Sequence, residues 1–336
     1  SYSVTGVQTC ALPIFTVVGS FSNQLPGAAG ETTTLLKNLG IPSATMVDGP
    51  AGIRINPKIY EKDGLYIKNP AEDPIFSLIL PPEKTKVDLS GTTAKFQYCT
   101  ALPVATMLAQ TWDLRLLEEA GKLIGAEMEE LDVDLWLAPA MNIQRNPLCG
   151  RNFEYFSEDP LVSGLCAAAI TKGVQSISGR GAVIKHLSAN NQETNRNYNN
   201  SHVSERALRE IYLKAFEICI KESRPLAVMT SVNLLNGVHT ANERELLTGV
   251  LRWEWGFKGM VMTDWGATSN LNGKKEQKYG PSSSALCIQA GNDLIMPGSQ
   301  ADVERILTAL DDGNLELVDL HSRAGNILSY MRQVVK

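Results

Sequence analysis

Residues 259–267 read Gly-Met-Val-Met-Thr-Asp-Trp-Gly-Ala, and this stretch decides the predicted fold. Its apolar run is typical of a strand buried on both faces, as in a parallel sheet. Asp264 follows the run directly. In a barrel of parallel strands the active site lies at the carboxyl ends, so an ionisable residue there indicates catalysis. The alternative is a helix cap, which we rank lower because Trp265 and Gly266 do not begin a helix.

Outward from this stretch, helical and strand patterns alternate from Pro103 onward. Predicted strands cover residues 44–47, 133–137, 182–184, 226–232, 260–263 and 294–296, with a candidate first strand at 15–19. Predicted helices cover residues 108–131, 160–175, 244–254, 283–290, 301–310 and 316–335, with another starting at Ser204. Residues 56–98 lack a helical period and are expected to be a long functional or mobile loop. The alternation predicts an α/β fold: a TIM-like (β/α)8 barrel over 15–315, irregular in its first strands, and a closing helix over 316–336.

Composition excludes several classes of protein. The 336 residues are 43% hydrophobic, enough for a large core, and the net charge of −5 argues against a nucleic-acid partner. No apolar run approaches the roughly 20 residues that a membrane span needs. The scattered cysteines form no Cys-x-x-Cys pair, so neither a metal site nor a disulfide framework is predicted. No glycine-rich dinucleotide motif follows a strand, and we expect no cofactor.

The first fourteen residues differ from the rest of the chain. Residues 4–14 read Val-Thr-Gly-Val-Gln-Thr-Cys-Ala-Leu-Pro-Ile, which matches without a mismatch the translation of a common short-read sequencing adapter. We therefore interpret residues 1–14 as a translated adapter, with the native N-terminus missing. A genuine strand or the apolar core of a signal peptide is the alternative, but the segment lacks a basic start. Location is left open between the cytoplasm and export.

Polar residues gather at the predicted strand ends. Asp48, Lys185, His186 and Asp264 each stand at the end of one, and residues 188–200 form an amide-rich loop that includes Arg196. Amide side chains both donate and accept hydrogen bonds, as a polyhydroxylated ligand requires. Alone, the loop could be a solvated surface segment. Beside these charged residues, it predicts a sugar pocket.

Four motifs then carry a resemblance to a known family. They are Asp48-Gly49-Pro50, the run Gly-Arg-Asn-Phe-Glu-Tyr-Phe-Ser-Glu-Asp-Pro at 150–160, Lys185-His186, and Met-Thr-Asp-Trp at 262–265. In this order they resemble glycoside hydrolase family 3. Residues 190–196, Asn-Asn-Gln-Glu-Thr-Asn-Arg, resemble its β-glucosidase branch. The resemblance covers about residues 27–310.

The resemblance implies a retaining β-glycosidase, an exo-acting β-glucosidase, that cleaves β-linked glucosides or short oligosaccharides from the nonreducing end. Asp264 matches the nucleophile that forms a covalent glycosyl-aspartate. The implied residues that bind the sugar are Asp48, Arg151, Lys185, His186 and Arg196, with Trp265 at the edge of the pocket. Cations near Asp264 are expected to lower its pKa. We interpret Glu154 as a structural ion partner of Arg151.

Two departures from the family pattern affect catalysis. Val232 stands where the family has a tyrosine that hydrogen-bonds to the nucleophile. Lys185-His186 is not followed by the second histidine that serves some single-domain members as acid/base. The acid/base is therefore expected to be a glutamate on the family's α/β sandwich domain, which nothing in this chain resembles. That domain, which precedes the barrel in one branch, is the expected missing partner, and the chain alone is expected to be poorly active.

Two rival functions remain open. Lys185 at a strand end could be the Schiff-base lysine of an aldolase barrel, which needs a neutral amine in a dry pocket or beside another cation. The chain could also be a catalytically impaired sugar-binding homologue. The loss of the tyrosine favours this second reading slightly, whereas the presence of Asp264 argues against it.

Overall fold

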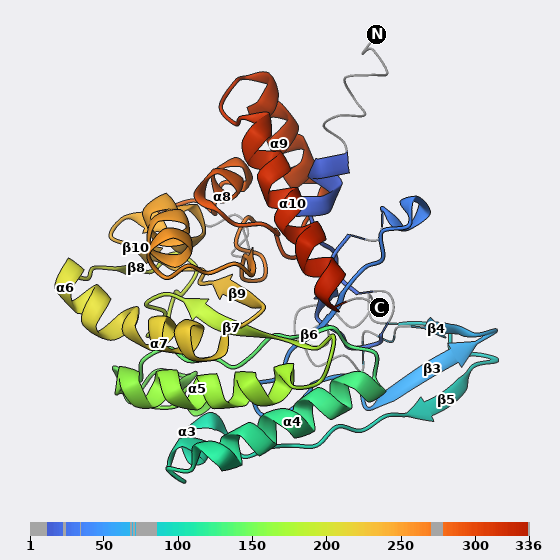
Figure 1. The fold of residues 1–336 in the computed structure, drawn as a ribbon. Helices are drawn as coiled ribbons and strands as arrows, with labels where there is room; N and C mark the ends of the chain where they lie inside the picture. Colours follow the sequence, from blue (N-terminus) through green and yellow to red (C-terminus); the bar gives the residue numbers. More distant parts are fainter. Residues whose placement is uncertain are drawn as a thin grey trace.

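The structure, a computed structural model, describes residues 12–22, 25–33, 35–67, 69, 71, 86–269 and 278–334. Helices surround a central six-stranded sheet, which is drawn in Figure 1. Its order is β1 (Gly30–Glu31), β2 (Thr45–Val47), β6 (Leu135–Trp136), β7 (Gly181–Leu187), β9 (Ala227–Thr230) and β12 (Met260–Met262). The strands from β2 to β12 pair in parallel, and β1 is antiparallel to β2.

Single pairings close this sheet into a ring. Met262 pairs in parallel with Leu294, and Ile295 pairs in parallel with Val18. Ser20 then pairs antiparallel with Glu31 of β1, and the two residues exchange both backbone hydrogen bonds. The predicted α/β barrel with irregular first strands is therefore confirmed. The predicted strand at 294–296 contributes only these isolated pairings.

The side chains on both faces of these strands are apolar, because successive residues point to opposite faces and each face packs into its own apolar cluster. Val228 and Val261 belong to one apolar cluster, which also contains side chains of α4 (Leu114–Glu130), α5 (Pro160–Gln175) and α7 (Lys214–Ser223). Met229 and Met260 belong to a second cluster with α8 (Ser284–Ala290), α9 (Gln300–Asp311) and α10 (Leu317–Val334). A period of two in side-chain direction thus buries every residue of such a strand.

Local sequence signals set several helix boundaries. The side chain of Asp159 accepts from the backbone N–H groups of residues 161 and 162, with Pro160 in the first turn, so α5 begins as predicted. The predicted helix 108–131 is instead two helices, α3 (Ala105–Ala109) and α4. Trp112 has a φ of 54°, and Asp113 caps the new helix, which separates the two.

Two other predicted helices depart from α geometry. The helix from Ser204 comprises α6 (Glu205–Ala207), the π-helical η4 (Leu208–Tyr212) and α7, and the predicted helix 244–254 is the π-helical η6 (Glu245–Glu254).

The helices α4 and α5 cross closely. A Cβ on Gly121 would lie 2.2 Å from the carbonyl oxygen of Ile170, so this crossing requires glycine.

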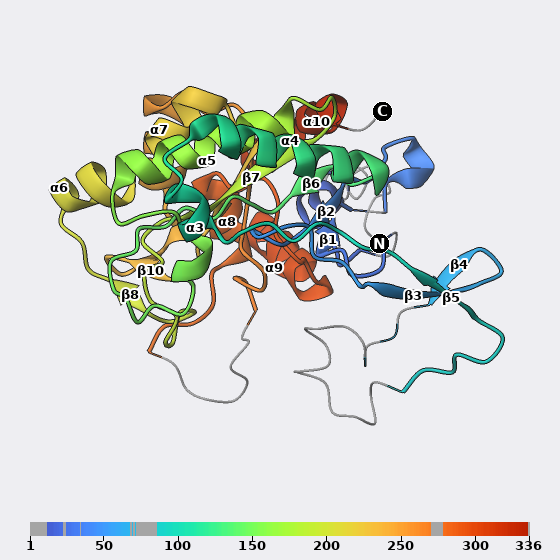
Figure 2. The same ribbon diagram turned by 90° about the horizontal axis from the view of Figure 1, so that it is seen from below.

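The excursion at 56–98 is more ordered than predicted. Its described part contains β3 (Lys58–Lys62), β4 (Leu65–Ile67) and β5 (Thr93–Phe96), which form an antiparallel sheet with β3 in the middle. Figures 1 and 2 show this sheet extending away from the barrel. Residues 72–85, which include the apolar run Ile-Phe-Ser-Leu-Ile-Leu at 75–80, lie outside the described residues. A second small sheet joins β8 (Asn200–Ser201), β10 (Leu234–Leu235) and β11 (Val238–His239).

The start of the chain differs from the predicted first strand. Residues 12–17 are helical, and only residues 18–20 pair with the sheet. Most of the segment interpreted as a translated adapter lies outside the described residues. Its last residue, Ile14, is 1% exposed and belongs to the second apolar cluster.

Ile14→Ala should lower the free energy of unfolding by ~2–5 kcal/mol, because a buried isoleucine would leave a cavity. Chemical denaturation measures the change, and Leu12→Ala, at a side chain 44% exposed, is the matched control. Equal stability of both variants and the parent would support the interpretation that residues 1–14 contribute nothing to the fold.

Candidate active site

The strand ends bring four predicted site residues to one edge of the barrel. Asp48 follows β2, Lys185 and His186 are near the end of β7, and Asp264 follows β12 by two residues. Because these strands run parallel, their carboxyl ends share one edge of the sheet. The predicted grouping of these residues is therefore produced by topology.

Asp48 is held between two cations. Lys185 Nζ donates to Asp48 Oδ1 at 2.7 Å, and Arg54 Nη2 donates to Oδ2. Burial acts to raise the pKa of Asp48, but Lys185 and Arg54 outweigh it and hold that pKa below its usual value. The Lys185 side chain is thus paired with a carboxylate, whereas a Schiff-base lysine needs a free amine, so this ion pair disfavours the aldolase reading.

Asp264 is nearly enclosed, with 14% of its side chain exposed. The backbone N–H of Trp265 donates to Oδ1 at 2.7 Å, and Oδ2 lies 3.9 Å from His186 Nε2. Burial raises the pKa of Asp264, and the nearby charges of Arg151, Arg196 and Lys185 oppose that rise without cancelling it. The cations thus lower the pKa of Asp264 as expected, but burial has the larger effect, so the net shift of that pKa is upward.

Arg151 is oriented from two sides. Its Nε donates to Glu154, and its Nη2 lies 3.1 Å from His186 Nε2. The Glu154 carboxylate is 5% exposed, so the pair is shielded from water, which agrees with the structural role expected for Glu154. Charge on Arg151 also acts on Asp264. Arg151 therefore supplies positive charge to the candidate nucleophile from a fixed position.

Arg196 and Trp265 lie at the periphery of this group. Arg196 is 41% exposed and donates to Glu193 Oε2 at 2.9 Å, while Asn190 Nδ2 donates to Glu193 Oε1 at 3.1 Å. Trp265 Nε1 donates to the carbonyl oxygen of Ala29 at 3.1 Å, which anchors the indole against the segment before β1. The role of either residue in sugar binding stays a prediction.

Sequence reasoning missed three supporting residues. Arg54 lies six residues after Asp48, Glu193 lies within the amide-rich loop, and Asn142 lies in the segment that follows β6. Asn142 is 2% exposed and hydrogen-bonds to His186. Their proximity to charged motif residues could have marked Arg54 and Glu193. Nothing in the local sequence signals the contact of Asn142 with His186.

Comparison with known proteins decides the family. The family described as "Glycosyl hydrolase family 3 N terminal domain" matches residues 84–330. The chain belongs to glycosyl hydrolase family 3. The motifs at Asp48, Arg151, Lys185-His186 and Asp264 thus meet in one site on a barrel of this family.

The relatives are longer than this family 3 chain. A β-glucosidase of Ruminococcus albus is 39% identical over 311 residues, which are 91% of this chain and 28% of that protein. An exo-α-(1→6)-L-arabinopyranosidase of Bifidobacterium longum is 37% identical over 298 residues, 89% of this chain and 34% of that protein. The structure of β-glucosidase 3B from Thermotoga neapolitana with glucose has a TM-score of 0.78 and 42% identity, covering 96% of this chain and 41% of that one.

Val232 follows β9 and is 5% exposed. Its side chain has no hydrogen-bonding group, and its backbone carbonyl accepts from His239 Nδ1 at 3.2 Å. Val232 therefore cannot make the hydrogen bond to the nucleophile that the family's tyrosine hydroxyl makes. The Asp264 carboxylate instead contacts the backbone N–H of Trp265 and the ring of His186.

Among the residues that the structure describes, no group of three or more His, Cys, Asp or Glu side chains is arranged to hold a metal ion. Within the same part of the chain, no helix has the length and apolar character of a membrane span.

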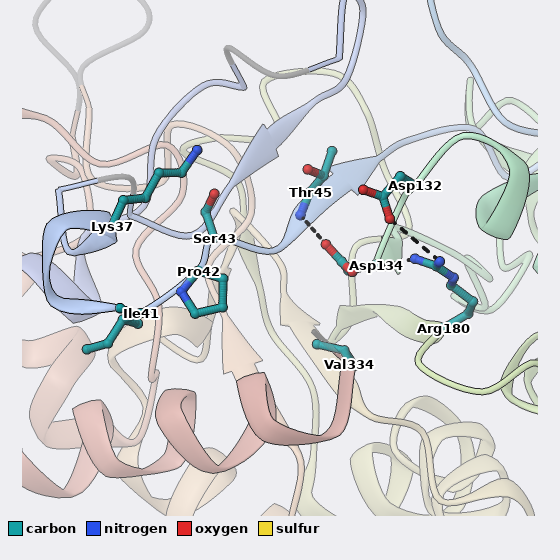
Figure 3. Close-up of a pocket in the computed structure, with 10 residues that line it drawn as sticks. Lys37, Ile41, Pro42, Ser43, Thr45, Asp132, Asp134, Arg180 and Val334 are labelled. Atoms are coloured by element: carbon teal, nitrogen blue, oxygen red, sulfur yellow. Dashed lines mark hydrogen bonds and ion pairs between the residues drawn. The ribbon is translucent and has the colours of Figure 1, made fainter. Parts of the chain in front are cut away.

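A separate pocket of about 550 Å³ lies at the opposite end of the barrel (Figure 3). Thr45, Asp134 and Arg180 line it where β2, β6 and β7 begin, far along the strands from Asp264. Asp134 Oδ2 accepts from the backbone N–H of Thr45 at 2.7 Å, and Arg180 lies 3.5 Å from Asp134 and 3.7 Å from Asp132. Arg180 pairs with both aspartates of this pocket, and none of the predicted catalytic residues lines it.

The folding stability should fall as Asp134 ionises. Burial raises the pKa of Asp134 to about 6, although the Thr45 N–H and Arg180 oppose the rise. The protonated form is thus favoured in the folded state, so its stabilisation is full below the ordinary aspartate pKa and is lost as pH rises through about 6. Relative to the parent, Asp134→Asn should gain about 1–2 kcal/mol of unfolding free energy between pH 5 and pH 8. Denaturation at both pH values measures this, and a parallel pH dependence in both proteins would contradict it.

Proposed function

We propose that this chain is the catalytic barrel of a retaining, exo-acting β-glucosidase whose nucleophile is Asp264. One observation carries the proposal: a nearly enclosed carboxylate at a strand end, beside His186 and within the field of three cations. The names of the relatives support a glycosidase, and the glucose complex of a relative supports glucose as the sugar. The chain spans less than half of each of those proteins, so the activity of the whole protein is part of the proposal.

The contacts of Asp264 support a different role for each of its oxygens. Oδ1 accepts the Trp265 N–H, which fixes the carboxylate plane and leaves Oδ2 as the attacking oxygen. In the first step, Oδ2 forms a bond to the anomeric carbon while the bond to the aglycone oxygen breaks, and that oxygen takes a proton from an acid. In the second step, water attacks the same carbon, loses its proton to the acid's conjugate base, and releases Asp264.

The surrounding polar residues suit a sugar. Lys185 and Asp48 present an ammonium donor and a carboxylate acceptor joined at 2.7 Å, with additional hydrogen-bonding capacity on both. Vicinal hydroxyls can use such a pair, because each hydroxyl donates one bond and accepts others. His186 lies beside the carboxylate of the nucleophile, Asp264, and Arg151 contacts His186. We assign these four residues to the sugar subsite, with Arg196 and Trp265 at its rim.

The acid/base is proposed to lie on the family's sandwich domain. Each described carboxylate beside the site already binds a cation: Asp48 binds Lys185 and Arg54, Glu154 binds Arg151, and Glu193 binds Arg196. Each of these carboxylates is therefore engaged in an ion pair, whereas the general acid must be free to approach the leaving group. Compartment is left open between cytoplasm and export.

A panel of aryl glycosides tests the proposal. The chain should release phenolate from activated β-glucosides in preference to β-xylosides, α-L-arabinopyranosides and α-glucosides. With added azide, which needs no deprotonation, NMR should show β-glucosyl azide as the first transfer product, because two inversions retain configuration.

Other outcomes would support the rivals. Glucose binding without turnover or covalent labelling would indicate the sugar-binding homologue. A borohydride-trapped carbonyl adduct on Lys185 would indicate the aldolase.

A further inference from the structure

The hydrogen bonds of the Asn142 side chain are all made with one residue, His186. Its Nδ2 donates to the carbonyl oxygen of His186 at 2.8 Å, and its Oδ1 accepts from the His186 backbone N–H at 2.9 Å. The same Oδ1 lies 3.3 Å from His186 Nδ1. Because the two backbone contacts fix which end of the amide is oxygen, an acceptor faces Nδ1. Nδ1 must therefore carry the proton that it donates.

The other ring nitrogen faces a donor. His186 Nε2 lies 3.1 Å from Arg151 Nη2, and a guanidinium nitrogen can only donate. Nε2 must therefore accept, so the two contacts together select the neutral Nδ1–H tautomer. With a proton on Nε2, both Nε2 and Arg151 Nη2 would be donors, so no hydrogen bond could form between them.

The charges facing the ring agree with a neutral imidazole. Arg151, Lys185 and Arg196 are cationic, and Asp264 Oδ2 lies 3.9 Å from Nε2 of the ring. Burial, and then these three cations, lower the pKa of His186 well below its usual value. The contact of His186 with Asp264 is thus not an ion pair at neutral pH.

We propose that Asn142 is a positioning residue of the active site, which holds His186 as the neutral Nδ1–H tautomer so that Nε2 orients Arg151 beside Asp264. Arg151 is then fixed at both ends, by Glu154 at Nε and by His186 at Nη2. The catalytic consequence rests on the proposed function of Asp264. The tautomer does not.

Nitrogen-15 NMR of the imidazole rings tests the tautomer on the unmodified chain. The chain has four histidines, so the ring signals can be assigned by single substitutions. We expect His186 to show a protonated Nδ1 and an unprotonated Nε2 that persist well below the pKa of an ordinary histidine. An Nε2–H tautomer, or an imidazolium at neutral pH, would overturn the proposal whatever the chain's activity.

Asn142→Asp tests the positioning role. A carboxylate facing Nδ1 stabilises the imidazolium, which would then oppose Arg151 and pair with Asp264. We expect the His186 signal to titrate near neutral pH and kcat/KM for an activated β-glucoside to acquire a new acidic limb. Asn142→Ala should lower kcat/KM by on the order of 10- to 100-fold through misplacement of Arg151.

Asn292→Asp is the matched control, because Asn292 is equally buried and donates elsewhere, to the carbonyl oxygen of Ala241. It should lower stability without changing the His186 spectrum. If Asn142→Asp and Asn292→Asp lower stability alike and neither alters the His186 titration, Asn142 is merely structural and the proposal fails. A changed titration without any glucosidase activity would instead retain the tautomer and refute the proposed function.

Discussion

Asp264→Asn should abolish the turnover of a dinitrophenyl β-glucoside, with a loss on the order of 10⁴- to 10⁶-fold, as when a nucleophile is removed from other enzymes. An amide cannot form the glycosyl-ester intermediate. The fold should survive, because asparagine keeps an oxygen for the Trp265 N–H that now donates to Oδ1. Since burial raises the pKa of Asp264, its ionised form costs folding free energy, so the variant should unfold at the same temperature or a higher one at neutral pH.

The matched control is Asp132→Asn, which removes a carboxylate of the same size from a side chain that is 97% exposed. Its turnover should equal that of the parent. A residual rate in Asp264→Asn within tenfold of the parent would contradict the assignment.

Covalent labelling locates the nucleophile independently of rates. A dinitrophenyl 2-deoxy-2-fluoro-β-glucoside should add one fluoroglucosyl group to the peptide that contains Asp264, because the fluorine slows the second step more than the first. Glucose should protect against labelling. A label on Asp48 or Glu193 would assign the nucleophile elsewhere.

The sequence predicted the central strands well because burial of both faces leaves an apolar run. The run before Asp264 and that before Lys185-His186 both became parallel strands. The start of α5 was equally predictable, since Asp159 and Pro160 act within one turn. Boundaries that depend on tertiary contacts were missed. Residues 12–17 are apolar enough for a strand, yet they are helical and place Ile14 in the core.

The residues of the candidate site likewise fall into those that the sequence predicted and those that it did not. Strand-end position and motif order identified Asp48, Lys185, His186 and Asp264, and the structure places them at one edge of the barrel. Their supporting partners come from distant segments, as in the bond from Asn142 to His186 across 44 residues of sequence. The sign of the pKa shift of Asp264 was also out of reach, because neighbouring cations are visible in the motifs, whereas burial is a property of the assembled fold.

The leaving group should decide whether this chain can act alone. The carboxylates described beside Asp264 bind cations, so we assign proton donation to a residue on the sandwich domain. Positioned proton transfer typically contributes ~10²- to 10⁴-fold. Dinitrophenolate departs without a proton, so glycosyl transfer to Asp264 should still occur. An alkoxide leaving group needs the proton, so cellobiose should be cleaved about 10²- to 10⁴-fold more slowly than by an enzyme that has the acid, and no cleavage should be detectable in the time that the activated substrate reacts.

The second step should be impaired as well, because water attacks without a base. A glycosyl-enzyme should therefore accumulate on Asp264 after a dinitrophenyl β-glucoside is added, visible by intact-mass spectrometry. Azide needs no deprotonation, so it should restore turnover and yield β-glucosyl azide. Cellobiose should remain uncleaved with or without azide. Rapid cellobiose hydrolysis by the chain would contradict this, because the acid/base would then lie within it, for instance at Glu276, outside the described residues. Azide rescue would in that case be absent too, since the second step would already have its base.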